Sequence, residues 1–244
     1  SCIGPCMDAK PNSIGATIKC INIEVLTMSY FGFVPSAELL KSIQTGIEKK
    51  NSNEPLYPLR DQTALMINDE IIHAILVELV HRFPASEKRV TAEKLAGYIK
   101  STVAVLLKQL LGKSSNDVVK QSIEISEQSL FKDPQGQYRV GTPLKAELVT
   151  NLKNNFAEIK SGNEINRAAL SELYKQFAEA AVRHFMNDFN KTLDLGMIKR
   201  KASDLGSSAV IKAIHIAVDK LIPNLSKEEL LALAEYHDTL FIQS

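Results

Sequence analysis

The chain has little of what marks turn-rich or extended proteins. Its 244 residues contain no Trp, 11 Gly and 9 Pro, and aromatic residues make up only 6%. Low Gly and Pro contents are expected where helices replace turns. A scarcity of aromatic residues disfavours a surface that stacks on nucleic-acid bases or on sugars. These absences favour a helical protein and give no support to a stacking surface.

The chain also lacks a charge excess and a long apolar run. It has 29 basic and 28 acidic residues, so its net charge of +1 provides no global attraction to nucleic acid or to an anionic membrane. The apolar stretch at residues 71–80 is interrupted by His73 and Glu78. It is far shorter than the roughly 20 residues that a membrane-spanning helix needs. We therefore expect no membrane partner.

Cysteine is confined to one end of the chain, as Cys2, Cys6 and Cys20. An odd number in this arrangement does not indicate a disulfide framework. Neither a neighbouring His nor a second cysteine pair completes a zinc site. We therefore expect a reducing, cytoplasmic location, and the sequence indicates no cofactor.

Residues 1–34 differ from the rest of the chain. Within residues 18–25, Ile21, Ile23 and Val25 alternate with polar residues, which is the period of a half-buried strand. We interpret residues 1–34 as an N-terminal extension that contains a strand.

From residue 35 onward, apolar residues recur at helical spacing, and Pro, Gly and capping residues separate the helices. The helices predicted in this way cover residues 36–50, 68–83, 91–111, 115–128, 142–160, 163–195, 207–222 and 226 onward. The segments between them are interpreted as a loop at 51–59, a β-hairpin at 130–140 and a basic linker at 199–201.

This pattern predicts a mainly α protein. We expect a multi-helix, bundle-like core with a small β element, which consists of the N-terminal strand and the hairpin. Residues 35–142 are interpreted as a helical region that ends in the hairpin. Residues 143–244 are interpreted as a C-terminal helical region that packs with the preceding one as a single unit.

One stretch of about seventy residues, 71–140, resembles a winged-helix domain. The sequences VTAEKLAGYI, STVAVLLKQLLG and LFKDPQGQYRVG stand where that family has its supporting helix (91–99), recognition helix (101–111) and wing (131–140). The resemblance implies nucleic-acid binding. The basic residues available for it are Lys94, Lys100, Lys108 and Arg139.

The same stretch departs from the winged-helix pattern in two places. The turn between the two helices is missing, because Leu95, Ile99, Val103, Leu106 and Leu110 keep one unbroken apolar stripe. In addition, a further helical pattern at residues 113–130 precedes the hairpin. We therefore predict one continuous helix over residues 91–111, about 30 Å long.

Three residues are candidate metal ligands. His184 and Asp188 are spaced i, i+4 on one predicted helix, which aligns them for a shared metal or a local pair. His237 lies on the apolar stripe of the last helix, and together the three could form a metal site. The alternative is that His237 is a core histidine with a single hydrogen bond and no metal, whose replacement by Leu is tolerated or mildly stabilising.

No recognised catalytic sequence occurs: the chain has no Gly-rich phosphate loop, no G-x-S-x-G and no H-E-x-x-H. We therefore expect a non-catalytic helical protein-interaction or regulatory module that binds another protein or a second copy of itself. The first alternative is a winged-helix-like regulator that binds nucleic acid through residues 71–140. The second is a metal-binding helical enzyme.

Overall fold

The computed structural model of the protein describes residues 29–243. It is mainly α-helical with a small four-stranded antiparallel sheet, which confirms the predicted fold class. The strand predicted at 18–25 and the three cysteines lie outside the described residues.

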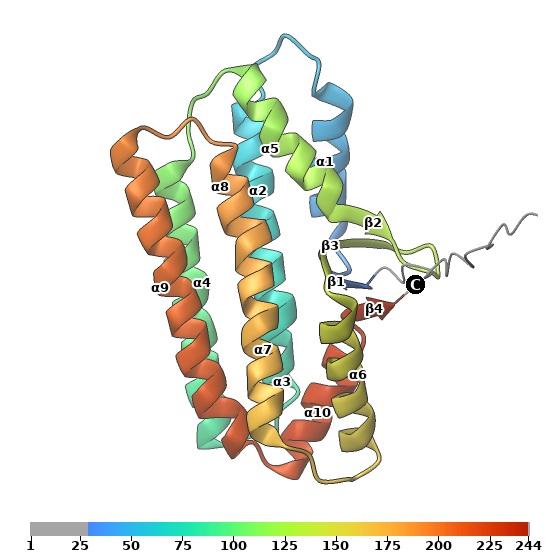
Figure 1. Cartoon of the computed structure of the whole chain (residues 1–244). Coiled ribbons are helices and arrows are strands. Elements are labelled where there is room, and N and C mark those ends of the chain that lie inside the picture. Colours follow the sequence, from blue (N-terminus) through green and yellow to red (C-terminus); the bar gives the residue numbers. More distant parts are fainter. Residues whose placement is uncertain (1–28, 244) are drawn as a thin grey trace, which may run out of the picture.

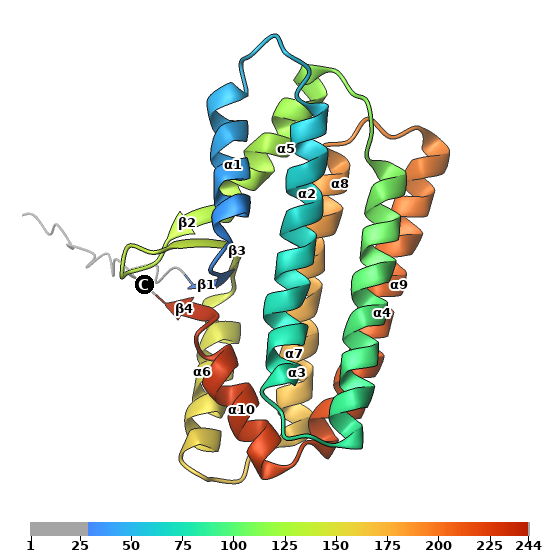
Figure 2. The same cartoon turned by 180° about the vertical axis from the view of Figure 1, so that it is seen from behind.

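Four long helical segments lie roughly parallel and form a bundle (Figures 1 and 2). Two of them contain a π-helical turn, so that each runs through three consecutive elements. The segments are α2 (Tyr57–Ile72) with η1 (His73–Val77) and α3 (Glu78–His81), α4 (Glu87–Leu110), α7 (Arg167–Val182) with η2 (Arg183–Asp188) and α8 (Phe189–Lys191), and α9 (Met197–Leu221).

The remaining helices and the sheet cover the side of α2 and α7 that faces away from α4 and α9 (Figure 1). A short 3-10 turn, η3, joins α9 to the last helix. These elements are α1 (Ala37–Lys49), α5 (Asn116–Ser129), α6 (Ala146–Lys160), η3 (Ile222–Asn224) and α10 (Lys227–His237).

The sheet joins both ends of the described chain. Its strands are β1 (Ser29–Phe33), β2 (Leu130–Lys132), β3 (Tyr138–Leu144) and β4 (Phe241–Gln243), in the order β2-β3-β1-β4. Phe31 of β1 pairs with Thr142 of β3 on one side and with Phe241 of β4 on the other. Sequence patterning did not predict β4, because a three-residue strand is too short to show alternation.

An aromatic cluster fastens this sheet to the helices. The rings of Phe31 and Phe177 have centroids 4.9 Å apart, and Phe177 meets Phe241 edge-on at 5.0 Å. Phe156 of α6 packs against Phe241 at 6.0 Å. These spacings are those that aromatic pairs prefer. The sheet is thus held on α6 and α7 through residues of β1 and of the neighbouring edge strand β4.

The continuous helix predicted over residues 91–111 is confirmed. Helix α4 runs without a break from Glu87 to Leu110, and Ser86 rather than Thr91 provides its N-cap by accepting a hydrogen bond from the Arg89 N–H. The two helices and the turn of a winged-helix domain are therefore absent from this stretch.

The predicted hairpin is also confirmed. Asp133 accepts hydrogen bonds from the backbone N–H groups of Gln135 and Gln137, which shapes an exposed turn. Phe131 pairs in register with Arg139 and stacks on Tyr30 at 4.7 Å.

Other predicted helix starts are wrong. Helix α2 begins at Tyr57 rather than near residue 68, since Pro58 is tolerated in the first turn of a helix. Helix α9 begins at Met197, so the basic residues 199–201 are helical and Ser207 is a buried residue of the helix interior instead of a cap. Pro143 belongs to β3, and α6 begins at Ala146.

We predict opposite effects of the same substitution at two glycines. A Cβ on Gly141 would lie 1.8 Å from the backbone oxygen of Phe31, where neither strand can give way. Gly141→Ala is expected to lower the free energy of unfolding by about 3 kcal/mol or more. In α4, a Cβ on Gly97 meets nothing within 4 Å, and Gly97→Ala is expected to raise it by about 0.5–1 kcal/mol. Urea unfolding measures both, and equal effects would contradict the close strand approach.

Candidate functional site

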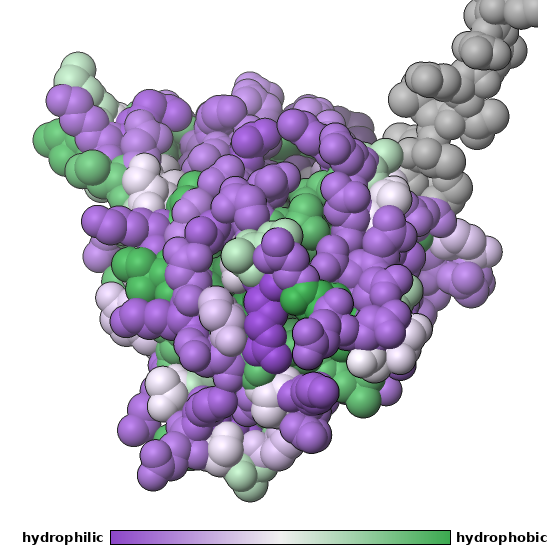
Figure 3. Space-filling view, turned by 60° about the horizontal axis from the view of Figure 1, so that its bottom comes forward, coloured by the Kyte–Doolittle hydropathy of each residue, from purple (hydrophilic) through white to green (hydrophobic). Residues whose placement is uncertain are grey.

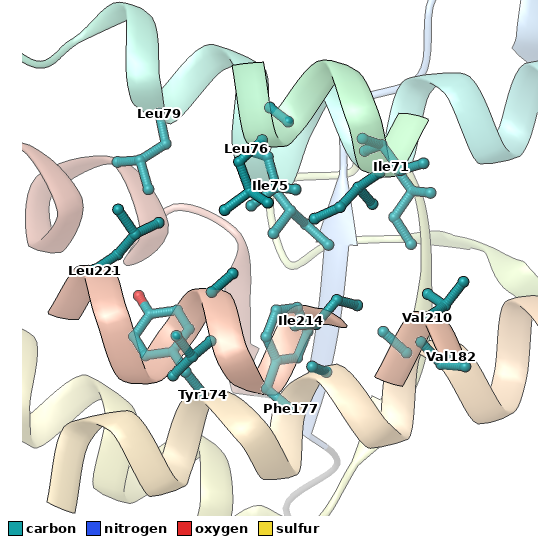
Figure 4. Close-up of a pocket in the computed structure, with 18 of the residues that line it drawn as sticks. Ile71, Ile75, Leu76, Leu79, Tyr174, Phe177, Val182, Val210, Ile214 and Leu221 are labelled. Carbon is teal, nitrogen blue, oxygen red and sulfur yellow. The ribbon is translucent and has the colours of Figure 1, made fainter. Parts of the chain in front are cut away.

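A cavity of about 170 Å³ lies at the centre of the four-helix bundle. Figure 4 shows side chains of α2, η1 and α3 facing those of α7 and α9 across it. Only three of its lining residues have polar side chains: Asn68, Tyr174 and His237. The described residues that line it include no Asp, Glu, Lys or Arg. The cavity is therefore an apolar, uncharged space.

Small side chains create this space. The inward faces of α4, α7 and α9 carry alanines at positions where a larger residue would fill the core. They are Ala92, Ala96, Ala178, Ala181 and Ala217. The pairs on α4 and α7 are spaced i, i+4 and i, i+3, so each pair lies on one face of its helix.

Both π-helical turns contribute to the cavity wall. Ile75 and Leu76 come from η1, and Phe185 and Met186 come from η2. At the end of η1, the N–H of Glu78 donates to the carbonyl of His73, five residues earlier instead of four. Such turns add a residue to a helix and frequently occur at functional sites.

Helix α10 donates hydrogen bonds to the carbonyl groups of η1. The Tyr236 hydroxyl donates to the Ala74 oxygen at 2.7 Å, and His237 Nε2 lies 3.0 Å from the Ile75 oxygen. Because a carbonyl can only accept, Nε2 carries the proton. His237 Nδ1 then accepts from the Tyr174 hydroxyl at 2.7 Å. Both ring nitrogens of this neutral histidine are therefore used.

Burial sets the protonation of this pair. His237 is 2% exposed, and burial lowers its pKa from 6.5 to about 4, although the hydrogen bond to Ile75 opposes the shift. Burial also raises the pKa of Tyr174 well above its usual value. Both groups are neutral near pH 7, which keeps this end of the cavity uncharged.

A polar space adjoins the other end of the cavity. A small cavity of about 10 Å³ there shares Asn68, Val103 and Met186 with the large one and is also lined by Asn190 and Ser203. Asn190 Nδ2 donates to Ser203 Oγ at 2.8 Å. Within the described chain, neither Asn190 Oδ1 nor the buried Ser207 hydroxyl oxygen has a hydrogen-bond partner.

The structure does not bring the three candidate metal ligands together. His184 Nε2 lies 2.8 Å from Ser129 Oγ, Asp188 pairs with Lys191 at 2.8 Å, and His237 has the partners given above. Residues 29–243 contain no group of three or more His, Cys, Asp or Glu side chains arranged to hold a metal. The expectation of a single hydrogen bond for His237 is wrong, because the ring makes two.

The four basic candidates for nucleic-acid binding are divided between ion pairs and exposed positions. Lys100 pairs with Asp69 at 2.7 Å, and Arg139 pairs with the buried Asp133 at 2.9 Å. Lys94 and Lys108 are exposed on α4. In the part of the chain that the structure describes, no helix is long and apolar enough to cross a membrane.

No protein family, curated protein or solved structure matches this chain. Its function therefore has to be inferred from the cavity itself.

Sequence reasoning identified His237 but missed the cavity around it. The signal was present in the alanines on the inward faces of α4, α7 and α9. Single alanines in a helical stripe also occur in tightly packed cores, so only the spatial arrangement shows that they face one another.

We predict that His237 makes the free energy of unfolding depend on pH below neutrality. Its folded-state pKa of about 4 lies below the ordinary 6.5, so between these pH values the unfolded chain binds a proton that the native chain does not. The stability that the neutral His237 ring contributes is fully present above pH 6.5. As the pH drops to 4, the free energy of unfolding falls by about 3 kcal/mol. Urea unfolding from pH 7 to 4 measures this loss.

His237→Leu is expected to remove that part of the acid dependence. The sequence led us to expect that this substitution is tolerated, and the two hydrogen bonds of the ring reverse that expectation. At pH 7 it should destabilise the fold by about 2–5 kcal/mol, because the Tyr174 hydroxyl and the Ile75 carbonyl lose their partner. The matched control, His81→Leu on the exposed end of α3, should keep the wild-type acid dependence. An unchanged dependence in the His237 variant would show that the ring is not held neutral.

Proposed function

We propose that the protein is a non-catalytic helical module that binds an uncharged, apolar small molecule inside its bundle. The observation that supports this is the 170 Å³ cavity with its apolar, uncharged lining. Binding of a small molecule in a helical core is compatible with the regulatory role expected from the sequence.

The energetics favour a binding role over a packing defect. Protein interiors rarely contain voids larger than a water molecule. At about 24 cal/mol per Å³, an unfilled cavity of this volume costs about 4 kcal/mol. That is a large fraction of the 5–15 kcal/mol that stabilises a typical protein. A ligand that fills the cavity recovers this energy as binding affinity.

Size and charge define the ligand. An engineered cavity of about 150 Å³ lined by Leu, Ile and Phe is dry and binds benzene, so this cavity accommodates at least one aromatic ring. A carboxylate or ammonium group would be buried here without an opposite charge, which costs several kcal/mol. The ligand is therefore uncharged.

The surface gives less support to a function than the interior does. The face seen in Figure 3 is predominantly hydrophilic, with hydrophobic residues mostly in small patches. A protein partner or self-association and a cytoplasmic location, both expected from the sequence, stay predictions that accompany this proposal.

The cavity predicts an unusual response to a larger side chain. Ala178 lines the cavity, and Ala178→Leu is expected to fill space and raise the free energy of unfolding by about 0.5–2 kcal/mol. Ala234 of α10 is fully buried in the core and does not line the cavity, and Ala234→Leu is expected to cost about 1–3 kcal/mol through overpacking. Circular dichroism melts compare the two variants.

Toluene provides the direct test of binding. At ten times its dissociation constant, it should stabilise the wild-type protein by about 1.4 kcal/mol, which raises the melting temperature by about 3–6 °C. In the Ala178→Leu variant the shift should be smaller, and Ala234→Leu should retain it. Destabilisation by both substitutions, together with no effect of toluene, would exclude the proposed function.

A further inference from the structure

We infer that the ligand has one hydroxyl group, which hydrogen-bonds to the side-chain amide of Asn190 while the apolar body fills the large cavity. This inference rests on the proposed function and specifies its ligand as an uncharged alcohol.

The buried amide of Asn190 is incompletely bonded. Its side chain is 5% exposed, Nδ2 donates to Ser203 Oγ, and Oδ1 has no partner within the described chain. If the amide is turned over, Oδ1 meets Ser203 and Nδ2 becomes the unpartnered atom. In either orientation, one buried polar atom needs a group that the described protein does not provide, and such atoms are rare in native structures.

The space beside this amide fits one small polar group. The cavity of about 10 Å³ that Asn190 lines is close to the volume of a single water-sized site. It adjoins the large cavity through residues of α2, α4 and η2, since Asn68, Val103 and Met186 line both. A molecule in the large cavity can thus place a terminal group beside Asn190.

A hydroxyl group matches this site better than other polar groups do. It donates to Oδ1 in one amide orientation and accepts from Nδ2 in the other. The small cavity is lined by no Lys or Arg that would neutralise a carboxylate.

At the opposite end of the cavity, the polar hydrogens are already used. There the Tyr174 hydroxyl donates to His237 Nδ1, and His237 Nε2 donates to the Ile75 carbonyl. Asn190 is the group that lacks a partner within the described chain, so the polar end of the ligand lies toward α8 and α9.

Three probes with the same ring test the inference: toluene, benzyl alcohol and benzoate. Their dissociation constants are measured by titration with methyl NMR on the wild-type protein and on Asn190→Leu. The readout is the ratio of the benzyl alcohol constant to the toluene constant. We expect this ratio to rise about tenfold in Asn190→Leu, with toluene binding retained and no binding of benzoate to either protein.

Two further variants make the result specific. Asn155→Leu, the same substitution at a half-buried position of α6 that lines neither cavity, should leave the ratio unchanged. Tyr174→Phe tests the reversed orientation: a change of the ratio in this variant and not in Asn190→Leu would overturn the inference.

If Asn190→Leu does not fold, the side-chain amide signals of Asn190 in the wild-type protein give the answer, because benzyl alcohol should shift them and toluene should not.

The outcomes separate the two proposals. If toluene binds and the ratio of dissociation constants is the same in wild type and Asn190→Leu, the hydroxyl contact is overturned. A bound water would then be the hydrogen-bond partner of Asn190, and the proposed function would stand. Failure of toluene and benzyl alcohol to bind would exclude the proposed function itself.

Discussion

The buried contact between α10 and η1 holds the cavity wall in place. Neutral His237 donates to the Ile75 carbonyl and accepts from Tyr174, so one imidazole joins α10, the π-turn and α7. Its position depends in turn on the sheet, because β4 follows α10 directly and pairs with β1. Pairing of β4 in the sheet thereby supports a hydrogen bond at one end of the cavity.

The two ends of the cavity differ because one is fully hydrogen-bonded and the other is not. At the α10 end, every polar atom of the His237 ring has a partner. Beside the α8 end, Asn190 of the adjoining small cavity has one partner within residues 29–243 for its two polar side-chain atoms. A low dielectric makes this difference matter, since an unpaired buried polar group is costly there. The packing of the helices thus defines both a volume and a direction for its ligand.

Much of the fold could be predicted from the sequence, for reasons that particular residues show. The unbroken stripe from Leu95 to Leu110 predicts α4 because helical periodicity is a local property. Local capping preferences failed at Ser207, since packing of α9 against α4 places this serine in the core, as it also places Gly206 against Leu106. The site was less predictable, because the cavity exists only where alanines from three helices face one another.

The π-turns show why such a site escapes sequence reasoning. In an ideal helix through residues 70–81, side chains at helical spacing stay on one face. The extra residue in η1 instead rotates the following segment about the helix axis relative to the preceding one. Ile71 before the turn and Leu79 after it nevertheless both line the cavity. The inserted turn also directs the carbonyls of Ala74 and Ile75 toward α10, where Tyr236 and His237 donate to them. A single local irregularity, stabilised by a distant helix, therefore helps to form both the wall of the cavity and its neutral, closed end.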